Sequence, residues 1–430
     1  MVVRQWCSYD FMAGDTTELL QSTTKKLIWK RGILFIMTSQ ERHEARYQRR
    51  KAKREQKYLS KYESCNNFEK VFTYSNMYHA YKKCILGVGW KSSTQKCKIN
   101  AVYNVYKGWE NVHKDKPKDF HFYDFDVYER GKKRHIRSVH ISERIPQRCL
   151  CDYSLIPVLS RSFIYDNGAS LAGKGIDFAI GRMGCHLDRY YRRHGNDGYI
   201  LTFDFKSFFD SISHKVAKRM MRENIQDDKI YNYAAHVVDR FKTPKQLAKL
   251  KSVGIDEGVG LGLGSQICQI LAVAIASPID HYVKEVLGIK EYGRYMDDGY
   301  LIHHDKKYLR KCIKLISIKA KELGLKINPK KTKIQKLCKG FRFLKIRFIL
   351  TETGKIIRKL ARESVTRMRR KLKKFKKLLD EGKMILEDIR TSIQSWISHV
   401  NKMNSYGTKC SMLALCDKLF DGRIEVKNGV

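Results

Sequence analysis

Two adjacent acids inside an apolar segment are the residues of this sequence best suited to chemistry. Asp297 and Asp298 separate two short strand-like runs, 294–296 and 300–302. Paired carboxylates in apolar surroundings are costly unless they hold a cation. Successive side chains of a strand point to opposite faces, so only a turn brings both carboxylates to one place, and Gly299 supplies the backbone freedom for it. The pattern predicts a hairpin with the two acids at its tip.

A third acid stands upstream, at the end of another apolar run. Residues 199–203 are predicted to form a strand, which Asp204 ends. Three acids on two strands suit a mechanism with two divalent ions about 3.5–4 Å apart, which activate an attacking oxygen and stabilise a leaving one. Hard oxygen ligands favour magnesium or manganese. Asp204, Asp297 and Asp298 are therefore the predicted catalytic residues and metal ligands, with two Mg²⁺ ions as the expected cofactor.

The charge balance indicates a polyanionic partner. Lys and Arg total 86 against 44 Asp and Glu, a net charge of +42. Basic residues bind phosphates by charge and counterion release, so nucleic acid is the expected partner. A membrane surface competes, but no apolar run approaches the roughly 20 residues that span a bilayer, and the longest, 267–279, is predicted to be a buried helix. The start of the chain lacks the order of a secretory signal, which favours a cytoplasmic protein.

Length and cysteine usage favour a self-sufficient core. With 430 residues and only six prolines, the chain is expected to form two or three subdomains around one main core. The 12 cysteines are scattered, and Cys149 and Cys151 form a C-x-C pair with no second pair at zinc-finger spacing. Free thiols are therefore expected.

A basic helix is predicted over residues 38–61. Thr38 or Ser39 is a candidate N-cap, with Glu41 completing a capping box. A helix with almost no apolar stripe cannot anchor in a core. It is either an arm that follows nucleic-acid phosphates or a solvated helix, and the two interpretations have equal weight. The candidate nucleic-acid-binding residues on it are Arg49, Arg50 and Lys53.

A second basic helix is predicted near the C-terminal end. Apolar residues recur at steps of three and four from Val365 to Leu379, which gives one stripe on an amphipathic helix. The basic back, with Arg369, Lys373 and Lys376, either grips a duplex or is an exposed solubilising face. Beside an acidic metal site, the grip is favoured.

Between residues 67 and 135, aromatic side chains and lysines interleave. Such interleaving can stack bases and contact phosphates, but tyrosines at helical spacing are more often core, and core is the preferred interpretation. The run from Gly131 to Arg137 is predicted to form a glycine turn and a strand, with basic side chains that can reach a triphosphate.

The strands at 199–205 and 295–302 are separated by a helical stretch at 214–245 and a glycine-rich run at 258–264. This order predicts an α+β architecture, a sheet with helices packed on one face. The glycine run does not fit a phosphate-binding loop, because no Gly-Lys-Ser/Thr follows it. Asp210 is expected to cap a helix that begins near Ser213.

Residues 125–400 resemble a reverse transcriptase, with blocks in that family's order. The blocks are Arg134 with Arg144-Ile145, Gly173-Lys174-Gly175, Phe203 to Asp210, Tyr295-Met296-Asp297-Asp298, Leu323 to Thr332 and Ser395-Trp396. The resemblance implies RNA-directed DNA polymerase activity and a right-hand fold of fingers, palm and helical thumb. The expected boundaries are an N-terminal extension with the basic helix at 1–66, fingers at 67–198, palm at 199–350, and thumb with tail at 351–430.

The resemblance also implies roles for individual residues. Asp204, Asp297 and Asp298 would be the metal ligands. Arg134, with Lys132 or Lys133, would contact the triphosphate, and Phe208 or Phe209 would exclude a 2′-hydroxyl by bulk. The implied partners are an RNA template, a DNA primer and dNTPs, with a dedicated structured RNA and an accessory protein as further candidates.

Two departures from the family pattern are informative. Leu263 stands where many members have glutamine, and Gln269 follows; both are candidate nucleotide-binding residues. This form is similar to reverse transcriptases of diversity-generating retroelements and of related retron-like and defence-associated bacterial groups. Loss of an amide near the nucleotide predicts lower fidelity, which Leu263→Gln should raise. In the block 341–346, which resembles the primer grip, Lys345 stands where glycine is usual.

Three functions remain open on the sequence. The first is an RNA-templated DNA polymerase that works with a structured RNA. The second is a non-catalytic RNA-binding assembly protein, against which the intact acids argue. The third is a defence-associated enzyme of the same fold that extends DNA without a template, with a protein hydroxyl as one candidate primer.

Overall fold

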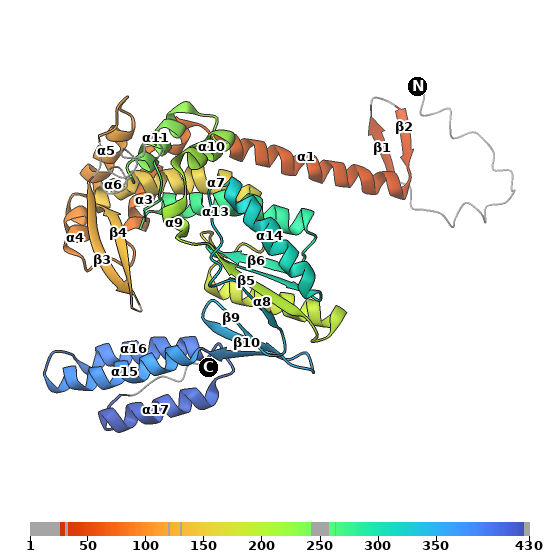
Figure 1. Ribbon diagram of the computed structural model, residues 1–430. Coiled ribbons are helices and arrows are strands. Elements are labelled where there is room, and N and C mark those ends of the chain that lie inside the picture. The colour runs from red at the N-terminus through yellow and green to blue at the C-terminus, as the bar shows by residue number, and fades with distance from the viewer. Residues whose placement is uncertain are drawn as a thin grey trace. The chain divides into compact units, whose positions relative to one another are not determined.

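The computed structural model describes residues 26–30, 33–118, 121–129, 131–241, 258–262 and 264–424. The chain divides into two units, Met1–Ser64 and Cys65–Val430, which are described separately. Figure 1 labels helices and strands of both units where there is room.

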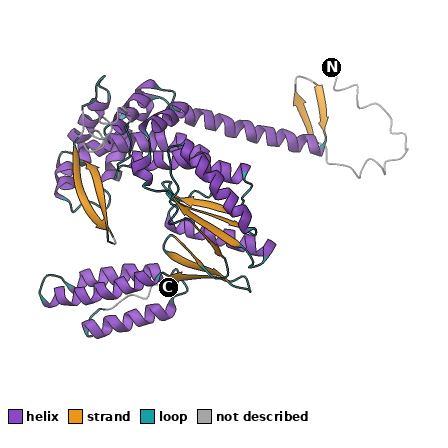
Figure 2. Cartoon of the chain, viewed as in Figure 1, coloured by secondary structure: helices purple, strands orange, loops and turns teal. Residues whose placement is uncertain are grey.

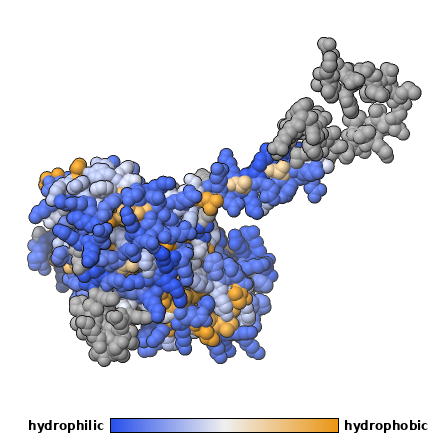
Figure 3. All heavy atoms as spheres, turned by 90° about the horizontal axis from the view of Figure 1, so that it is seen from above, coloured by the Kyte–Doolittle hydropathy of each residue, from blue (hydrophilic) through white to orange (hydrophobic). Residues whose placement is uncertain are grey.

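The first unit contains a hairpin and a long helix. Strands β1 (Lys26–Lys30) and β2 (Ile33–Met37) are antiparallel, with Lys26 opposite Met37. Helix α1 (Ser39–Cys65) begins at the predicted capping box: the Thr38 amide donates to Glu41 Oε2 at 2.7 Å, and the Glu41 amide donates to Thr38 Oγ1 at 3.3 Å. The predicted helix is confirmed, and Figure 3 shows its largely hydrophilic surface.

The second unit begins with a helical region. Its elements are α2 (Phe68–Val71), α3 (Tyr74–Ile85), α4 (Ser92–Ile99), α5 (Ala101–Val112), α6 (Ile141–Leu150), η1 (Cys151–Leu155), α7 (Ile156–Leu159) and η2 (Ser160–Ser162). Between α5 and α6 lies the antiparallel hairpin of β3 (Phe122–Glu129) and β4 (Lys132–Val139). The structure divides the interleaved aromatics: Tyr81 is buried, whereas Trp90 and Tyr103 are exposed. The core interpretation therefore holds for only some of them.

A four-stranded antiparallel sheet forms the centre of the second unit (Figure 2). Its order is β6 (Tyr292–Tyr295), β7 (Asp298–His303), β5 (Tyr199–Asp204) and β8 (Lys333–Lys336). The helices of this region are α8 (Ile176–His194), α9 (Phe208–Ser211), α10 (His214–Asn224), α11 (Asp228–Asp239), α13 (Gln266–His281), η3 (Tyr282–Val286) and α14 (Lys306–Glu322).

Helices cover both faces of this sheet, whereas the sequence pattern predicted helices on one face only. Leu201 on β5 packs in the main core cluster with residues of α13 and α14. Its neighbour Ile200 points the other way and packs in a second cluster with residues of α8. Because consecutive residues of β5 are apolar, the strand buries both of its faces.

Two helix predictions near this sheet have definite outcomes. The predicted buried helix at 267–279 is confirmed as α13, most of whose side chains are buried. The prediction that Asp210 caps the helix beginning near Ser213 is wrong. Ser213 itself is the N-cap of α10, because its side chain accepts from the Lys215 amide, and Asp210 lies inside the short helix α9.

The C-terminal part has its own small sheet and helical cluster. Strands β9 (Phe341–Phe343), β10 (Ile346–Leu350) and β11 (Ile356–Leu360) are followed by helices α15 (Arg362–Asp380), α16 (Leu386–Val400) and α17 (Tyr406–Phe420). The predicted apolar stripe of α15 is confirmed, since Met368, Leu372 and Phe375 are buried in a third cluster with α16 and α17.

In the part of the chain that the structure describes, the cysteines are free thiols. A search of the same residues for a helix with the length and apolar character of a membrane span finds none.

Candidate active site

The predicted hairpin is present, but only Asp297 lies in its turn, while Asp298 begins strand β7; the sheet brings the third acid beside it. Tyr295 at the end of β6 faces Asp298 at the start of β7, so Met296 and Asp297 form the turn. Asp298 is the Cα partner of Asp204 across the β5–β7 pair. The Phe205 amide donates to the Asp297 carbonyl at 3.2 Å, which fixes the turn against the end of β5. Three acids from two distant segments therefore lie at the same end of the sheet.

The turn does not use the glycine that the sequence analysis assigned to it. Met296 has a φ of 52°, in the left-handed region, whereas Gly299 lies in β7 with no positive φ. A Cβ on Gly299 would lie 2.3 Å from Phe203 Cζ. The predicted role of Gly299 is therefore wrong: glycine is needed there because the Phe203 ring packs against its backbone, not because the chain turns.

Burial and mutual repulsion make the acid cluster expensive to ionise. Burial, then repulsion by Asp297 and Asp204, raises the pKa of Asp298 to about 7. Burial also raises the pKa of Asp297, with Asp204 adding to the shift and Lys331 and Arg134 opposing it. A site that must carry several negative charges in a partly dry environment favours a bound cation.

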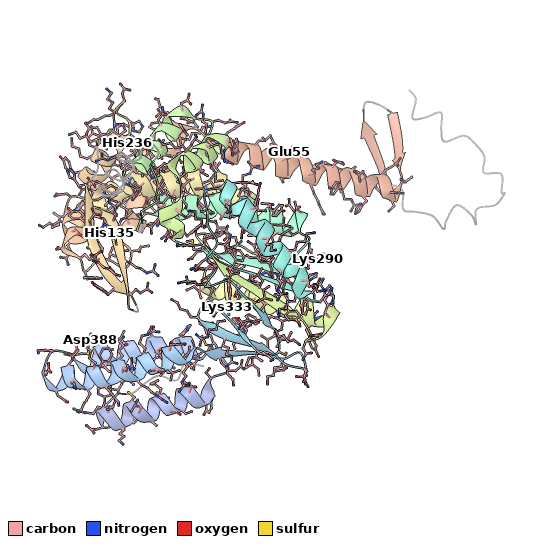
Figure 4. All side chains as sticks on the ribbon, in the orientation of Figure 1. Glu55, His135, His236, Lys290, Lys333 and Asp388 are labelled. Carbon is pink, nitrogen blue, oxygen red and sulfur yellow. The ribbon has the colours of Figure 1, made fainter. Side chains whose placement is uncertain are left out.

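Lys331 belongs to this site, although the sequence assigned it no role of its own. It stood only within the block from Leu323 to Thr332 that resembles the family. Its ammonium donates to Asp204 Oδ2. Burial opposes protonation of Lys331, but the hydrogen bond to Asp204 and the neighbouring acids raise its pKa overall. Asn328 adds a backbone bond to the Asp204 carbonyl at 2.8 Å. The segment before β8 therefore fixes Asp204 at the end of β5; Lys333, labelled in Figure 4, begins that strand.

The donor chemistry of the three acids fits a divalent cation. Within the described ranges, no three His, Cys, Asp or Glu side chains meet in a ready-made metal cluster, and Lys331 provides the positive charge at Asp204. Magnesium is commonly held by one or two carboxylates together with substrate phosphates, so a complete protein cage is not required. The excess negative charge and the hard oxygen donors of Asp204, Asp297 and Asp298 meet that requirement.

Arg134 is the basic residue of the β3–β4 hairpin that reaches the acids electrostatically. It opposes the rise in the pKa of Asp297 that burial causes, and it forms an ion pair with Glu129 at 3.0 Å. Lys133 is the residue before Arg134 on the strand, so its side chain leaves the opposite face, where it pairs with Asp126 at 2.8 Å. His135, labelled in Figure 4, follows Arg134 and lies 3.2 Å from the same carboxylate. The side chain of Lys132 lies outside the described part.

The other predicted nucleotide-binding residues have different outcomes. Phe208 is buried and stacks on Phe205, with ring centroids 5.3 Å apart, whereas Phe209 is only half-buried. Of the two phenylalanines, Phe209 is therefore the one available to a ligand. Leu263 lies outside the described residues. Gln269 is exposed on α13, where it lines a cavity.

That cavity, of about 690 Å³, lies among α3, α6 and α13. Four buried polar atoms on its lining have no hydrogen-bond partner among the described residues: Arg144 Nε, Gln147 Nε2, Ser265 Oγ and Gln266 Oε1. Buried polar groups are normally paired, so a cluster of unpaired ones indicates a polar ligand or ordered water. The sequence reasoning did not single out Gln147, which follows Arg144 by one helical turn, or Gln266.

A strained turn carries the lysine that replaces the usual glycine. Leu344 and Lys345 connect β9 to β10 with φ values of 47° and 68°. Left-handed conformations at two non-glycine residues are unfavourable, which explains the preference for glycine at such a turn. Lys345 also opposes the rise in the pKa of Asp298, so its ammonium lies within electrostatic reach of the acids.

The predicted nucleic-acid-binding residues lie on two helices. Arg49, Arg50 and Lys53 are exposed on α1, in the first unit. On α15, Arg369 and Lys373 are exposed, while Lys376 is half-buried and pairs with Asp380 at 2.9 Å.

Comparisons with known proteins agree with these features. Residues 131–348, which include all three acids, match the family model described as reverse transcriptase (RNA-dependent DNA polymerase). No curated protein matches the chain.

Two solved structures are similar to parts of the chain. One is an apo telomerase from Candida tropicalis truncated from its C-terminal domain, with 14% identity, a TM-score of 0.39, and coverage of 55% of each chain. The other is telomerase from Candida albicans in complex with a TWJ fragment of telomeric RNA, with 14% identity, a TM-score of 0.39, and coverage of 73% of this chain and 58% of that one. The chain therefore spans 55% to 58% of the length of these two proteins.

Proposed function

This chain belongs to the reverse transcriptase (RNA-dependent DNA polymerase) family, and we propose that it synthesises DNA by copying an RNA template. The observation that carries the proposal is that Asp204, Asp297 and Asp298 lie at the same end of the central sheet, inside the matched segment. In the proposed reaction, a primer 3′-hydroxyl attacks the α-phosphate of a dNTP, and pyrophosphate leaves.

The chain's own groups divide the work of this reaction. The divalent ions, proposed to be two Mg²⁺, would be held by Asp204, Asp297 and Asp298. When bound, such ions activate the attacking hydroxyl and stabilise the leaving oxygen. Lys331 fixes the Asp204 carboxylate by a charged hydrogen bond. Arg134, within electrostatic reach of Asp297, is proposed to bind the triphosphate, because its planar guanidinium matches phosphate oxygens.

The cavity among α3, α6 and α13 is proposed to receive a base of the RNA template. A nucleobase has donors and acceptors on its edge and apolar faces. The cavity offers unpaired donors on Arg144 and Gln147 and an unpaired acceptor on Gln266, beside apolar residues such as Leu171 and Ile270. This complementarity supports an RNA template as the partner.

Primer extension on a defined RNA template tests the proposed function. With all four dNTPs and Mg²⁺, the expected product is full length, and omission of one dNTP stops synthesis at the first template position that requires it. Products that ignore the template would indicate untemplated synthesis. The absence of extension together with retained RNA binding would indicate a binding protein. Either result would contradict templated polymerisation.

Phe209 is proposed to exclude ribonucleotides. Its half-buried ring, beside the buried Phe208, is available to a nucleotide sugar, where bulk would clash with a 2′-hydroxyl. We expect Phe209→Ala to increase the incorporation of an rNTP relative to the matching dNTP by about 10- to 100-fold, because the pocket gains room for one hydroxyl. Competition between the two nucleotides in single-turnover extension measures the ratio. An unchanged ratio would remove Phe209 from this role.

Helix α15 is proposed to grip the template–primer duplex as part of a thumb at 351–430, with fingers at 67–198 and a palm at 199–350. The exposed Arg369 and Lys373 flank the buried stripe, since each directly follows one of its buried residues. We expect Arg369→Gln with Lys373→Gln to lower the slope of log Kd against log salt by about 2, since each lost phosphate contact releases about one counterion fewer. Arg423→Gln, near the end of the described chain, should leave the slope unchanged.

Helix α1, through Arg49, Arg50 and Lys53, is proposed to be a second basic arm for RNA.

The biological setting is proposed from the sequence form around Leu263 and Gln269. That form supports a diversity-generating retroelement or a related bacterial element, with a dedicated structured RNA as template and an accessory protein as a further partner. A defence-associated role is the alternative. Sequencing of extension products measures the low fidelity that this setting implies, and a fidelity that Leu263→Gln does not raise would count against it.

A further inference from the structure

We infer that Arg294 is a positioning residue that holds the Met296–Asp297 turn in its working conformation, an inference that rests on the proposed function. Arg294 is the last but one residue of β6, and it is 1% exposed. A fully buried guanidinium is unusual and must be well paired. The hydrogen bonds of the Arg294 guanidinium extend to the turn that carries Asp297.

Four hydrogen bonds fix the Arg294 guanidinium. Nε donates to Asp280 Oδ1 at 2.7 Å, and Nη2 donates to Asp280 Oδ2 at 2.6 Å, a bidentate pair. Nη2 also donates to the Val273 carbonyl at 3.1 Å. Nη1 donates to the Met296 carbonyl at 2.9 Å. Three of the bonds anchor the side chain to α13, and the fourth reaches the turn.

The turn needs such a bond because its backbone is unfavourable. Met296 has a φ of 52°, a conformation that non-glycine residues rarely adopt and that persists only when the surroundings enforce it. The Met296 carbonyl belongs to the peptide unit that continues into Asp297. A charged donor on that carbonyl stabilises the left-handed residue and orients the acid that follows it.

The same side chain links the turn to the nucleotide side of the site. Helix α13, which supplies Asp280 and Val273, also carries Gln269 on the lining of the proposed template cavity. Asp280 accepts a further bond from the Tyr292 hydroxyl at 2.6 Å. Arg294 therefore connects the helix beside the template to the turn beside the acids. Its loss should affect the chemical step more than substrate binding.

The test removes the buried charges together, because an unpaired buried charge would unfold the protein. In the variant Arg294→Met, Asp280→Leu, Tyr292→Phe, apolar side chains of similar size replace the network, a change that proteins often tolerate. We expect the thermal midpoint to stay within a few degrees of wild type and kcat to fall about 10- to 100-fold. The KM for dNTP and the Kd for primer–template should change less than threefold. A compensated variant that folds and keeps its kcat would overturn the inference.

Two further variants separate positioning from general support. Tyr292→Phe alone removes one bond to Asp280 and leaves the bond to Met296, so its kcat should stay within twofold of wild type. Adding Met296→Gly to the compensated variant should restore several-fold of the lost kcat, because glycine adopts a positive φ without help. Failure of the glycine to restore kcat would contradict a role through the turn.

A readout without catalysis keeps the inference distinct from the proposed function. Hydrogen exchange of the peptide covering 294–300 should be at least tenfold faster in the compensated variant than in wild type, while exchange in α8 stays unchanged. If wild type extends no primer, the proposed function fails, and the exchange result still decides whether Arg294 orders the turn. Equal exchange in both proteins would overturn the inference whatever the activity.

Discussion

Asp298→Asn abolishes primer extension and, at pH 8 without divalent ions, raises the thermal midpoint of the protein. Loss of one ligand carboxylate should lower kcat about 10³-fold or more, because bound ions contribute several kcal/mol of charge stabilisation and each 1.36 kcal/mol is a factor of ten. The free energy of unfolding should increase, because the substitution removes a buried negative charge that the neighbouring acids repel. Extension assays and thermal melts measure the two effects.

The pH dependence of this stability follows from the raised pKa. The folded-state pKa of Asp298 is about 7, above the value of about 3.9 for an unfolded aspartate. The native state therefore holds the extra proton between these values, and wild-type stability falls as the pH rises through that window. The gain from Asp298→Asn should be absent near pH 3, partly developed at pH 5, and largest at pH 8, on the order of 4 kcal/mol. A gain that did not depend on pH would contradict this account.

Two controls accompany the Asp298 prediction. Asp188→Asn makes the same chemical change on an exposed face of α8, and it should alter neither extension nor the midpoint at any of these pH values. Added Mg²⁺ should raise the wild-type midpoint at pH 8, because a ligand that binds only the native state stabilises it. The same addition should have a much smaller effect on Asp298→Asn.

Gly299→Ala destabilises the protein and lowers extension together. The added methyl would lie 2.3 Å from Phe203 Cζ and 2.5 Å from Cε1, and Phe203 is buried. Overpacking of this kind costs about 1–3 kcal/mol. Gly299 adjoins Asp298 and Phe203 adjoins Asp204, so the strain should separate the acids. A misplacement of about 1 Å can lower the rate about 100-fold.

A second-site change tests the cause of the Gly299→Ala effect. Phe203→Leu in the same chain makes room for the methyl, and it should restore part of both stability and activity. Gly181→Ala is the matched control: it lies inside α8 with nothing within 4 Å of the added methyl, so it should stabilise the protein by about 0.5–1 kcal/mol. Wild-type stability in Gly299→Ala would show that the ring moves freely and that the packing argument is wrong.

Local patterns in the sequence were enough to predict several elements. The capping box at Thr38, the apolar stripe of α15 and the buried helix α13 each depend on residues within a few turns of one another. The acidic hairpin was predictable for the same reason, because a strand, two acids and a strand are adjacent in the chain. A local pattern does not say which neighbour a side chain meets, and the errors at Asp210 and Gly299 arose there.

The sequence by itself determined the chemistry available to this protein: three acids, a large basic excess and a family order of blocks. The tertiary structure decided how those groups are held. Lys331 bonds to Asp204 from 127 positions away, Phe203 makes glycine necessary at position 299, and the Arg294 side chain joins α13 to the turn. These contacts depend on the packing of segments far apart in the chain, and no periodicity or spacing encodes which of them will touch.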